Sequence, residues 1–284
     1  MSGKTPILAG VVGNPIGHSL SPLIHSVWAA RAGVNGYYVP VEAPASYEEF
    51  AAVIDGLRVV GFAGVNVTLP HKENAFRYAT GKSARATAAQ AANMLTFTEE
   101  GTLADNSDIS GFAAALKAEL KTGEALGPAL VLGAGGAARG IILALKELDC
   151  KRITLTNRTR VRAETLAETF LLDHVVDWED REKALGESHV VVNTTSLGMS
   201  GQPPLSFNLS GLPADGIVSD IVYTPLETPL LKDAARAGAR CIDGLSMLMH
   251  QAAPGFRAWF KGPAVVDNDL RDTLVATLER RVCG

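Results

Sequence analysis

The chain has 284 residues, of which 47% are hydrophobic and 20% are charged, and its formal net charge is -4. This length predicts two domains, and the composition is typical of a folded globular protein. No block of like charges and no apolar run of the ~18 residues needed to span a bilayer occurs, which argues against nucleic-acid and membrane partners. The start, Met1–Pro6, lacks a signal-peptide pattern. Cys150, Cys241 and Cys283 lack the spacing of a metal site or a disulfide set, so we expect a cytoplasmic protein.

The first half, to about residue 106, alternates strands with helices. One helix is expected to begin with Ser21 as its N-cap and Pro22 at its first position. A second is expected after Ser46, whose spacing to Glu49 forms a capping box. The strands are expected at Ile7–Val12, Tyr37–Val41 and Phe62–Val67. This alternation predicts an α/β fold.

The second half predicts a doubly wound parallel sheet, because short apolar strands alternate with longer helical segments. Its strands are expected at Ala129–Leu132, Ile153–Leu155, His189–Asn193, Ile217–Val222 and Arg240–Ile242. Its helices are expected at Phe112–Lys121, Ile141–Leu148, Arg162–Phe170 and Pro229–Ala237. The last segment, Leu245–Val282, has helical periodicity only.

A glycine-rich loop follows the first of these strands and runs directly into a helix, which is the context of a dinucleotide-binding loop. Gly133 permits the tight turn, and Gly135 lets a pyrophosphate approach the backbone. The N-terminus of the helix offers free N–H groups to that anion. We therefore predict that the cofactor is bound by Gly133, Ala134, Gly135, Gly136 and Ala137.

The next connection between strand and helix indicates which dinucleotide binds. NAD-binding proteins usually carry an acidic residue about 20 residues after the loop, whereas residues 157–162 here read NRTRVR. Guanidinium groups attract the 2′-phosphate of NADP, which a carboxylate would repel. We therefore predict NADP, with Arg158, Thr159 and Arg162 as its contacts and Arg160 in solvent. The alternative is a solvated helix start, but arginines in a first turn oppose the helix dipole and favour an anion there.

A set of polar residues occupies the first half, at loops and strand ends. Asn66 and Thr68 project to the same side of a strand end, because side chains alternate along a strand. Such a set suits a small substrate with several hydroxyl groups. It consists of Ser19, Ser21, Asn66, Thr68, Lys72, Asn93, Asn106 and Asp108.

Oxidation of a secondary alcohol requires a group that accepts a proton as the hydride leaves. Lys72 can do this when a carboxylate and partial burial tune it, and Asp108 is the expected partner. A surface position for Lys72 is the alternative, since lysines are mostly exposed. Other proton carriers in the chain are His18, His25, His71 and His250. No pair of histidines has metal-site spacing with a third ligand, so we predict no metal.

An ordered set of short motifs runs along the whole chain. It comprises residues 13–16 (GNPI), 18–22 (HSLSP), 64–72 (GVNVTLPHK), 105–111 (DNSDISG), 133–137 (GAGGA), 157–159 (NRT), 193–199 (NTTSLGM), 220–225 (DIVYTP), 228–231 (TPLL) and 244–252 (GLSMLMHQA). Each motif alone is modest, but the ordered set is specific. With this set the chain resembles the shikimate dehydrogenase family along its whole length.

The resemblance implies a reversible, NADPH-dependent reduction of 3-dehydroshikimate to shikimate, a step of chorismate and aromatic amino acid biosynthesis. It implies that Lys72 and Asp108 form the acid/base pair. The substrate would be bound by Ser19, Ser21, Asn66, Thr68, Asn93, Asp108, Tyr223 and Gln251. The adenosine phosphate would be held by Asn157, Arg158, Thr159 and Arg162. The nicotinamide side would be lined by Thr195, Met199, Ile221, Gly244 and Met247.

The resemblance also implies the domain organisation. Residues 1–109 plus 245–284 would form the substrate-binding, catalytic domain, and residues 110–244 a Rossmann NADP domain. The C-terminal helices would pack back on the first domain and bring Gln251 to a substrate cleft between the domains, whose closure gates turnover. Met94 departs from the family, which commonly carries Thr there. The oligomeric state is left open, with a homodimer as one option.

Two other functions compete with this one. The first is NAD-dependent oxidation of quinate or shikimate, against which the Asn-Arg-Thr cluster at residues 157–159 argues. The second is an NADPH-binding sensor without chemistry, against which the retention of Lys72 and Asp108 argues. Fold alone does not decide between them.

Overall fold

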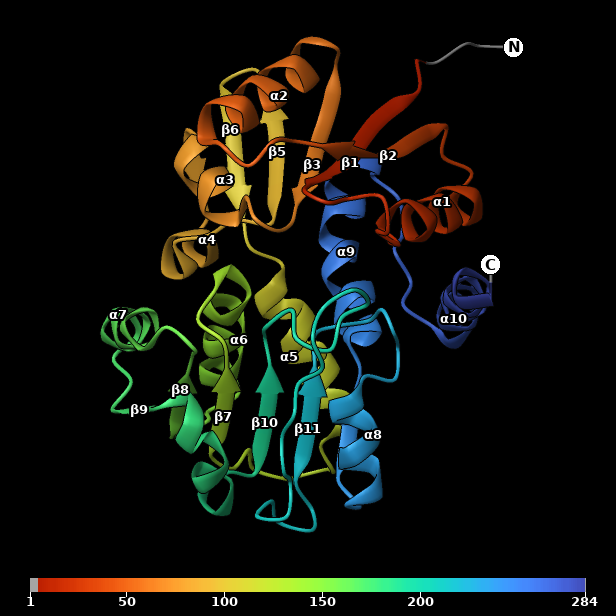
Figure 1. Cartoon of the computed structure of the whole chain (residues 1–284). Helices are drawn as coiled ribbons and strands as arrows, with labels where there is room; N and C mark the ends of the chain where they lie inside the picture. The colour runs from red at the N-terminus through yellow and green to blue at the C-terminus, as the bar shows by residue number, and fades with distance from the viewer. Residues whose placement is uncertain (1–4, 284) are drawn as a thin grey trace. The chain divides into compact units, whose positions relative to one another are not determined.

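The structure, a computed structural model, describes residues 5–283 and divides into two compact units (Figure 1). One unit comprises Met1–Asp108 and Leu248–Ala276, and the other Ile109–Met247 and Thr277–Gly284. The side chain of Cys283 and most of Met1–Pro6, on which the expectation about a signal peptide rests, lie outside the described residues. Within residues 5–283, no helix has the length and apolarity needed to cross a membrane.

The first unit contains a mixed sheet in the order β2-β1-β3-β5-β6-β4. Its strands are β1 (Ile7–Gly13), β2 (Gly36–Glu42), β3 (Phe62–Val67), β4 (Gly81–Lys82), β5 (Met94–Thr98) and β6 (Gly101–Asp105). Strand β1 is parallel to β2 and β3, whereas β5 is antiparallel to both β3 and β6. The three predicted strands of this half are confirmed, and the hairpin of β5 and β6 is an element that the sequence pattern did not reveal.

The helices of the first half are α1 (Ser21–Ala32), α2 (Tyr47–Val59), α3 (Lys72–Tyr78) and α4 (Ala84–Ala89). The predicted cap of α2 is confirmed, because the Ser46 hydroxyl accepts a hydrogen bond from the Glu49 backbone N–H at 3.3 Å. The predicted cap of α1 is wrong. Its N-cap is Leu20, and Ser21 is the first helical residue. The Ser19 hydroxyl accepts the Ser21 backbone N–H at 3.2 Å, which leaves the Ser21 hydroxyl available for other contacts.

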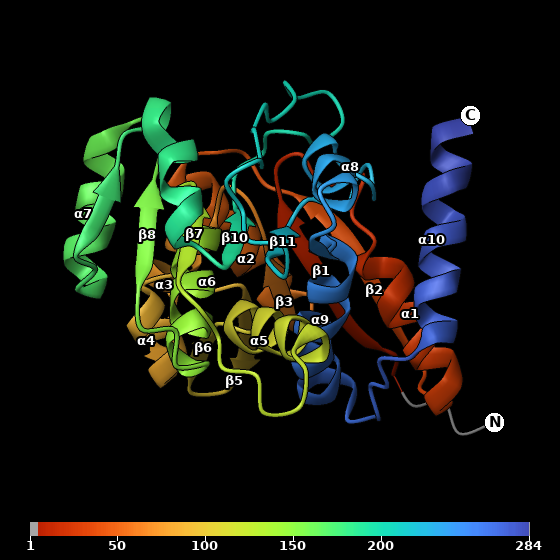
Figure 2. The same ribbon diagram turned by 90° about the horizontal axis from the view of Figure 1, so that it is seen from below.

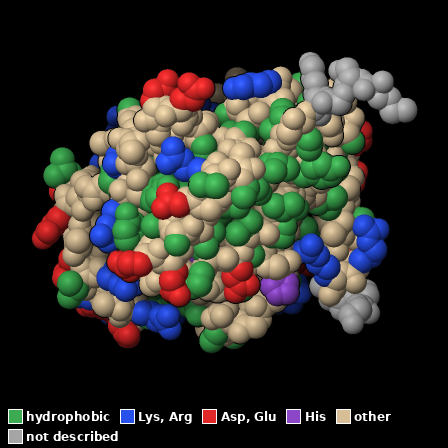
Figure 3. All heavy atoms as spheres, turned by 90° about the horizontal axis from the view of Figure 1, so that it is seen from above, with side chains coloured by type: hydrophobic (Ala, Val, Ile, Leu, Met, Phe, Trp, Pro, Cys, Tyr) green, Lys and Arg blue, Asp and Glu red, His purple; other side chains and the backbone are tan. Residues whose placement is uncertain are grey.

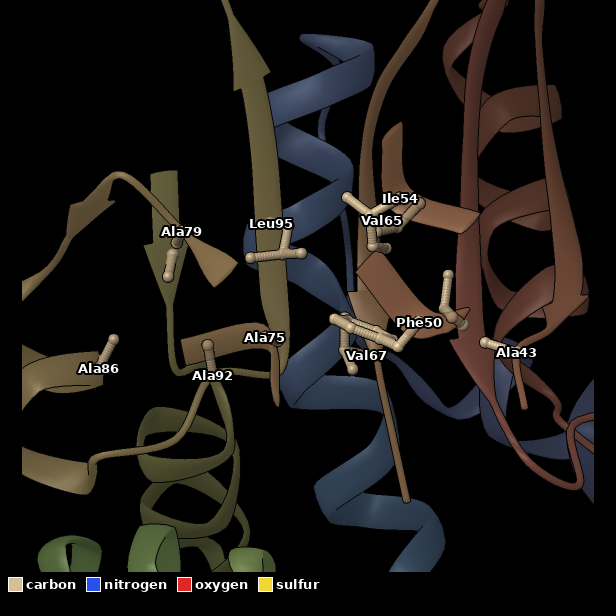
Figure 4. Close-up of a cluster of buried hydrophobic side chains, with 12 residues drawn as sticks. Ala43, Phe50, Ile54, Val65, Val67, Ala75, Ala79, Ala86, Ala92 and Leu95 are labelled. Carbon is tan, nitrogen blue, oxygen red and sulfur yellow. The ribbon is translucent and has the colours of Figure 1, made fainter. Parts of the chain in front are cut away.

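The core of the first unit lies between its sheet and α2 (Figure 4). Phe50 and Ile54 from α2 are fully buried against Val65, Val67 and Leu95 of the sheet. Burial of each such side chain contributes roughly 1.5–3 kcal/mol relative to leaving it in water. This packing fixes the strand ends from which the polar residues project.

The C-terminal helices are α9 (Gly244–Phe260) and α10 (Asn268–Cys283), as the helical periodicity predicts. Trp259 of α9 belongs to the first unit and covers β3 at Gly64, where a Cβ atom would lie 2.1 Å from the indole nitrogen. The same indole nitrogen donates to the Thr96 hydroxyl of β5 at 3.0 Å. Gly64 therefore allows the close approach of α9 to this sheet.

The second unit contains a sheet in the order β12-β11-β10-β7-β8-β9, with all strands parallel. Its strands are β7 (Ala129–Leu132), β8 (Ile153–Thr156), β9 (His174–Val176), β10 (Val190–Asn193), β11 (Ile217–Asp220) and β12 (Arg240–Ile242). The central strands are buried along their length, as expected for a parallel sheet covered on both faces. The predicted doubly wound sheet is confirmed.

Helices lie on both sides of this second sheet, with α6 on one side and α8 on the other (Figure 2). The helical elements of this part are α5 (Asp108–Glu119), α6 (Gly136–Glu147), α7 (Arg160–Phe170), the 3-10 helix η1 (Trp178–Glu187) and α8 (Pro229–Arg236). Helix α5 begins four residues earlier than the predicted Phe112, which places Asp108 in its first turn.

Figure 3 views the molecule from above and shows hydrophobic side chains gathered on that face, with charged groups around them. The exposed apolar residues of the first unit include Tyr37 and Val39 of the edge strand β2, which are 60% and 39% exposed. Tyr38, which lies between them in the chain, is the one buried residue of β2, and only 6% of its surface is exposed.

Candidate active site

The ends of three strands bring the polar residues of the first unit together. Strand β5 is antiparallel to β3 and to β6, so β3 and β6 run in the same direction. Their carboxyl ends therefore lie at the same edge of the sheet as the amino end of β5. Asn93 directly precedes β5, Thr68 directly follows β3, and residues 106–108 follow β6.

Lys72 and Asp108 meet at this edge. The Lys72 ammonium donates to Asp108 Oδ2 at 2.6 Å, although the two residues are 36 positions apart in the chain. Their side chains are only 11% and 5% exposed, so the pair is largely removed from water. A buried ammonium and carboxylate are expected only as partners, because an unpaired charge there is costly. The alternative that Lys72 lies exposed on the surface is therefore wrong.

Asn93 is the centre of a buried hydrogen-bond network around this pair. Its side-chain nitrogen lies within hydrogen-bond distance of Asp108 Oδ1 (2.9 Å), Ser107 Oγ (3.0 Å) and Gln251 Oε1 (3.1 Å). Its Oδ1 accepts the Ser107 backbone N–H at 2.7 Å. The Ser107 hydroxyl donates to the Gln251 backbone carbonyl at 2.8 Å, which ties α9 to the network. The structure thus brings together four of the predicted residues: Lys72, Asn93, Asp108 and Gln251.

A second group of predicted residues lies around Asn66. The Asn66 side-chain nitrogen donates to the Asn93 backbone carbonyl at 3.1 Å, which joins it to the first network. Tyr38, which the sequence reading missed, donates its hydroxyl to Asn66 Oδ1 at 2.8 Å and also hydrogen-bonds the Ser21 hydroxyl. Thr68 is half-buried beyond the end of β3, and its backbone N–H donates to Val12 at 2.9 Å. Nothing in the strand pattern distinguishes Tyr38 from Tyr37 as the buried one.

The side chains of two remaining polar residues, Asn106 and Ser19, form hydrogen bonds with backbone groups and not with the side chains of the network. Asn106 donates to the Ala91 carbonyl at 3.0 Å and accepts the Asp108 backbone N–H at 3.1 Å, so it shapes the turn that presents Asp108. Ser19 is half-buried, and its hydroxyl accepts the backbone N–H of Ser21, the first residue of α1.

The histidines considered as proton carriers have other environments. His25 is buried among aromatic rings, its Nδ1 lies 2.9 Å from the Ser21 carbonyl, and burial lowers its pKa to about 3. His71 is fully buried, stacks on Phe50, and its Nε2 lies 3.1 Å from the Ala43 carbonyl. Burial also lowers the pKa of His250. The buried rings of His25 and His71 therefore serve packing.

The glycine loop of the second unit connects β7 to α6. Gly133 has φ +109°, and a Cβ atom there would lie 2.6 Å from the Thr194 hydroxyl. Only glycine adopts this conformation at little cost. Gly135 is the N-cap of α6, with no side-chain cap and no atom within 4 Å of an added Cβ. The start of α6 thus has no side-chain cap and is unobstructed at Gly135, which suits a bound anion.

The connection from β8 to α7 carries the arginines. Asn157 donates to the Thr159 carbonyl at 2.9 Å and orders the turn. Arg160 is paired with Glu164 at 2.7 Å and with Asp177 at 2.6 Å, so its charge is already compensated. Arg158 and Arg162 are exposed, and their guanidinium groups make no hydrogen bond or ion pair with any residue in the described range. They are the guanidinium groups that remain for an anionic ligand.

The loops after β10 and β11 are joined by a buried carboxyl group. Asp220, which is 0% exposed, accepts hydrogen bonds from the Asn193 side chain at 2.9 Å and from the Thr228 hydroxyl at 2.8 Å. Asn193 in turn accepts the backbone N–H and the hydroxyl of Thr195 at 3.0 Å and 2.7 Å. Burial raises the pKa of Asp220 to about 6. The sequence reading missed Asp220 as an organiser of the loop that carries Thr195.

The other predicted nicotinamide-side residues follow the same sheet edge. Ile221 comes directly after β11, and Gly244 follows β12 with its Cα so close that a Cβ atom would lie 2.3 Å from the Ile221 carbonyl. Met199 lies in the loop after β10, and Tyr223 and Met247 are half-buried and buried, respectively. In an open parallel sheet, ligands bind beyond the carboxyl ends of the strands, where the strand order reverses. Here the order reverses between β7 and β10.

The chemistry of the two sites differs. Among residues 5–283, no group of three or more His, Cys, Asp or Glu side chains could hold a metal ion. The first unit offers hydroxyl, amide and carboxylate groups beside one buried ammonium. The second offers an uncapped helix start and unpaired guanidinium groups, the features of a dinucleotide-binding protein.

Comparisons with known proteins agree with this class. Residues 11–95 match the shikimate dehydrogenase substrate binding domain, and residues 117–199 match the shikimate / quinate 5-dehydrogenase family. A shikimate dehydrogenase (NADP(+)) of Jannaschia sp. is 46% identical over 279 residues, covering 97% of this chain and 100% of that protein. The chain belongs to the shikimate dehydrogenase family.

Solved structures of this family show the same architecture. Shikimate 5-dehydrogenase from Thermus thermophilus, in complex with NADP(H) and shikimate, is 33% identical with a TM-score of 0.84, covering 96% of this chain and 99% of that one. Quinate dehydrogenase from Corynebacterium glutamicum, in complex with NAD, is 29% identical with a TM-score of 0.85, covering 95% and 99%. The fold therefore fits both activities, and the cofactor-binding residues have to discriminate between them.

Proposed function

We propose that this chain is an NADP-dependent shikimate dehydrogenase, which reversibly reduces 3-dehydroshikimate to shikimate in chorismate and aromatic amino acid biosynthesis. The observation that carries the proposal is the buried pair of Lys72 and Asp108, 2.6 Å apart within a network of amide and hydroxyl groups. Such a pair supplies a proton beside groups that recognise a polyhydroxylated ring. Relatives named shikimate dehydrogenase (NADP(+)) support it.

The choice of NADP rests on the connection after β8. Arg158 and Arg162 stand in solvent without partners, and the first turn of α7 contains no acidic residue. Residues 133–137 and the start of α6 would hold the pyrophosphate, and Arg158, Thr159 and Arg162, with the turn at Asn157, would hold the 2′-phosphate. When bound, the reduced cofactor supplies the hydride for the ketone carbon.

The residues of the first unit supply the proton. In the reductive direction, the Lys72 ammonium donates a proton to the oxygen of the substrate ketone, which becomes the hydroxyl group, and Lys72 is left as a neutral amine. In the oxidative direction the neutral amine accepts the hydroxyl proton. Asp108 accepts the hydrogen bond that orients the Lys72 ammonium group. Asn93 holds Asp108 through its other oxygen, at 2.9 Å.

We propose the remaining roles on the same basis. The substrate is bound by Ser19, Ser21, Asn66, Thr68, Asn93, Asp108, Tyr223 and Gln251, and the nicotinamide side is lined by Thr195, Met199, Ile221, Gly244 and Met247. Residues 1–109 with 245–284 form the substrate domain, and residues 110–244 the cofactor domain. A cytoplasmic location is supported by Cys150 and Cys241, which are both free thiols.

A steady-state assay with two acids and two cofactors tests the proposal. We expect turnover with shikimate and NADP that exceeds turnover with quinate or with NAD. Replacing Lys72 with Ala should lower kcat by a factor of about 100 or more, the usual contribution of a proton-transfer group, with a smaller change in the KM of shikimate. The control is Lys183→Ala, whose side chain is 79% exposed in the second unit. An active Lys72→Ala enzyme, or a wild type that prefers quinate and NAD, would contradict the proposal.

A further inference from the structure

The buried tyrosine of β2 sits between two residues of the proposed substrate site. Its phenol contacts the Ser21 hydroxyl, from α1, and donates to Asn66 Oδ1 at 2.8 Å, from β3. One side chain therefore joins two elements that each present a substrate-binding group. We propose that Tyr38 is a positioning residue for shikimate, which sets the orientation of the Asn66 amide and the Ser21 hydroxyl. The proposal rests on the proposed function.

The ring of Tyr38 is held rigidly. It stacks on His25 with ring centroids 3.7 Å apart and an angle of 15°, and Trp259 lies 6.4 Å away. His25 is itself fixed by the contact of its Nδ1 with the Ser21 carbonyl at 2.9 Å. The phenol oxygen consequently has little freedom to move. Its hydrogen bonds therefore also restrict the side chains of Asn66 and Ser21.

The Tyr38 phenol and the Asn93 carbonyl together hold the Asn66 amide in one orientation. A side-chain amide can be flipped by 180°, and only its partners decide the orientation. The Asn93 carbonyl can only accept, so the end of the amide that lies 3.1 Å from it is the nitrogen, and the Tyr38 hydroxyl donates to the oxygen at the other end. The second hydrogen of Asn66 Nδ2 has no partner among the described residues, so it is the donor that remains for a substrate hydroxyl.

The protonation of the phenol is constant over the working range of pH. Burial raises the pKa of Tyr38 well above its usual range. The hydroxyl therefore keeps its proton at neutral pH and can donate it to Asn66.

Removal of the hydroxyl group has two consequences that differ from a loss of packing. The ring of Phe can keep the stack on His25, so the core stays filled. The buried Asn66 Oδ1 and Ser21 hydroxyl each lose a partner, and an unpaired buried polar group is costly. Both groups are then free to adopt orientations that do not suit the substrate.

Kinetics of Tyr38→Phe test the role. We expect the KM of shikimate to rise about tenfold, the factor that corresponds to one hydrogen bond of ~1.4 kcal/mol. We expect kcat to stay within about threefold, and the KM of NADP to stay unchanged, because the hydrogen-bond partners of Tyr38 are Asn66 and Ser21 and not Lys72. The matched control is Tyr78→Phe, which removes a hydroxyl that donates to Asp55 at 2.5 Å on the surface of the same unit.

A double-mutant cycle separates positioning from general destabilisation. If Tyr38 acts through Asn66, the Tyr38→Phe change should have a smaller effect on shikimate binding in an Asn66→Ala background than in the wild type, because only the contact with Ser21 remains there. Isothermal titration with shikimate measures this binding even where turnover is lost. A Tyr38→Phe enzyme with unchanged shikimate KM, or with effects that add to those of Asn66→Ala, would overturn the inference. A wild type without activity on shikimate would instead overturn the proposed function.

Discussion

Buried polar side chains in this chain depend on partners that are distant in sequence. Asn93 illustrates this, since its amide contacts Asp108 and Gln251, which lie 15 and 158 positions away. Each of these groups is too deeply placed to rely on water, so every hydrogen bond that is removed leaves an unpaired atom. The geometry of the Lys72–Asp108 pair is therefore a property of the network and not of the two residues alone.

Asp220 makes the stability of the protein depend on pH. Burial raises its pKa from the usual 3.8 to about 6. Between these values the folded state keeps the proton that the unfolded chain has released, so stability falls as pH rises from 3.8 to 6, by about 3 kcal/mol in total. In Asp220→Asn this decline should be absent. Chemical denaturation at pH 4.5 and at pH 7.5 measures the difference.

The control for this measurement is Asp173→Asn, which changes an exposed carboxylate of the same unit. Its stability should follow that of the wild type at both pH values. An Asp220→Asn variant that loses the same free energy between pH 4.5 and 7.5 as the wild type would show that the buried carboxyl does not carry the effect.

Individual residues also show where sequence reading reaches its limit. The pair of Lys72 and Asp108 was predictable from residue chemistry, and the arginines after β8 from their spacing to the glycine loop. Tyr38 and Asp220 were not, because neighbours in sequence give no sign of their partners, which lie 28 and 27 positions away in Asn66 and Asn193. The predicted cap at Ser21 is wrong because the helix begins at Ser21 itself, after an N-cap at Leu20.

Among the helices and strands, those with a strong local sequence pattern were predictable. The strands of the parallel sheet are continuous apolar runs, and α2 has its own capping signal. The hairpin of β5 and β6 was not predicted. It depends on pairing with β3 and on the turn at Gly101, whose φ is +145°. This hairpin carries Asn93 and the turn to Asp108, so the predicted residues were recognised without the element that presents them.

The strand–loop–helix element of β7 and α6 uses its two glycines for different reasons, which substitution can separate. Gly133→Ala should destabilise the fold by ~1–3 kcal/mol, because φ is +109° and Thr194 occupies the place of the Cβ atom. Gly135→Ala should leave stability within ~0.5 kcal/mol, since its φ is −96° and no atom lies within 4 Å of its Cβ.

Cofactor kinetics complete this comparison. Gly135→Ala should raise the KM of NADP about tenfold or more, because the added methyl group takes the space that a pyrophosphate needs beside the start of α6. Thermal unfolding without cofactor and the KM of NADP are the two measurements. A Gly135→Ala variant that is unstable but binds NADP normally would show that this glycine serves the turn and not the ligand.

At the scale of the whole molecule, the chain leaves the first unit after Asp108 and re-enters it at Leu248. The returning segment supplies Gln251 to the polar network and Trp259 to the sheet, where the indole covers Gly64 and donates to Thr96 at 3.0 Å. The first unit is therefore complete only after Ile109–Met247 of the second unit have been synthesised. Loss of the Trp259 contact should therefore lower the stability of the first unit and leave that of the second unit unchanged.

Trp259→Ala tests this dependence. Truncation of a buried Trp costs ~3–5 kcal/mol, so the first unit should unfold at a lower temperature and shikimate should no longer stabilise the protein. NADP should still raise the melting temperature of the second unit, because a ligand stabilises the unit that binds it. Trp178→Ala, in the half-buried start of η1, is the control for loss of an indole in the second unit. If Trp259→Ala weakened NADP protection as much as shikimate protection, the two units would unfold as one, and the returning segment would stabilise the whole chain and not the first unit alone.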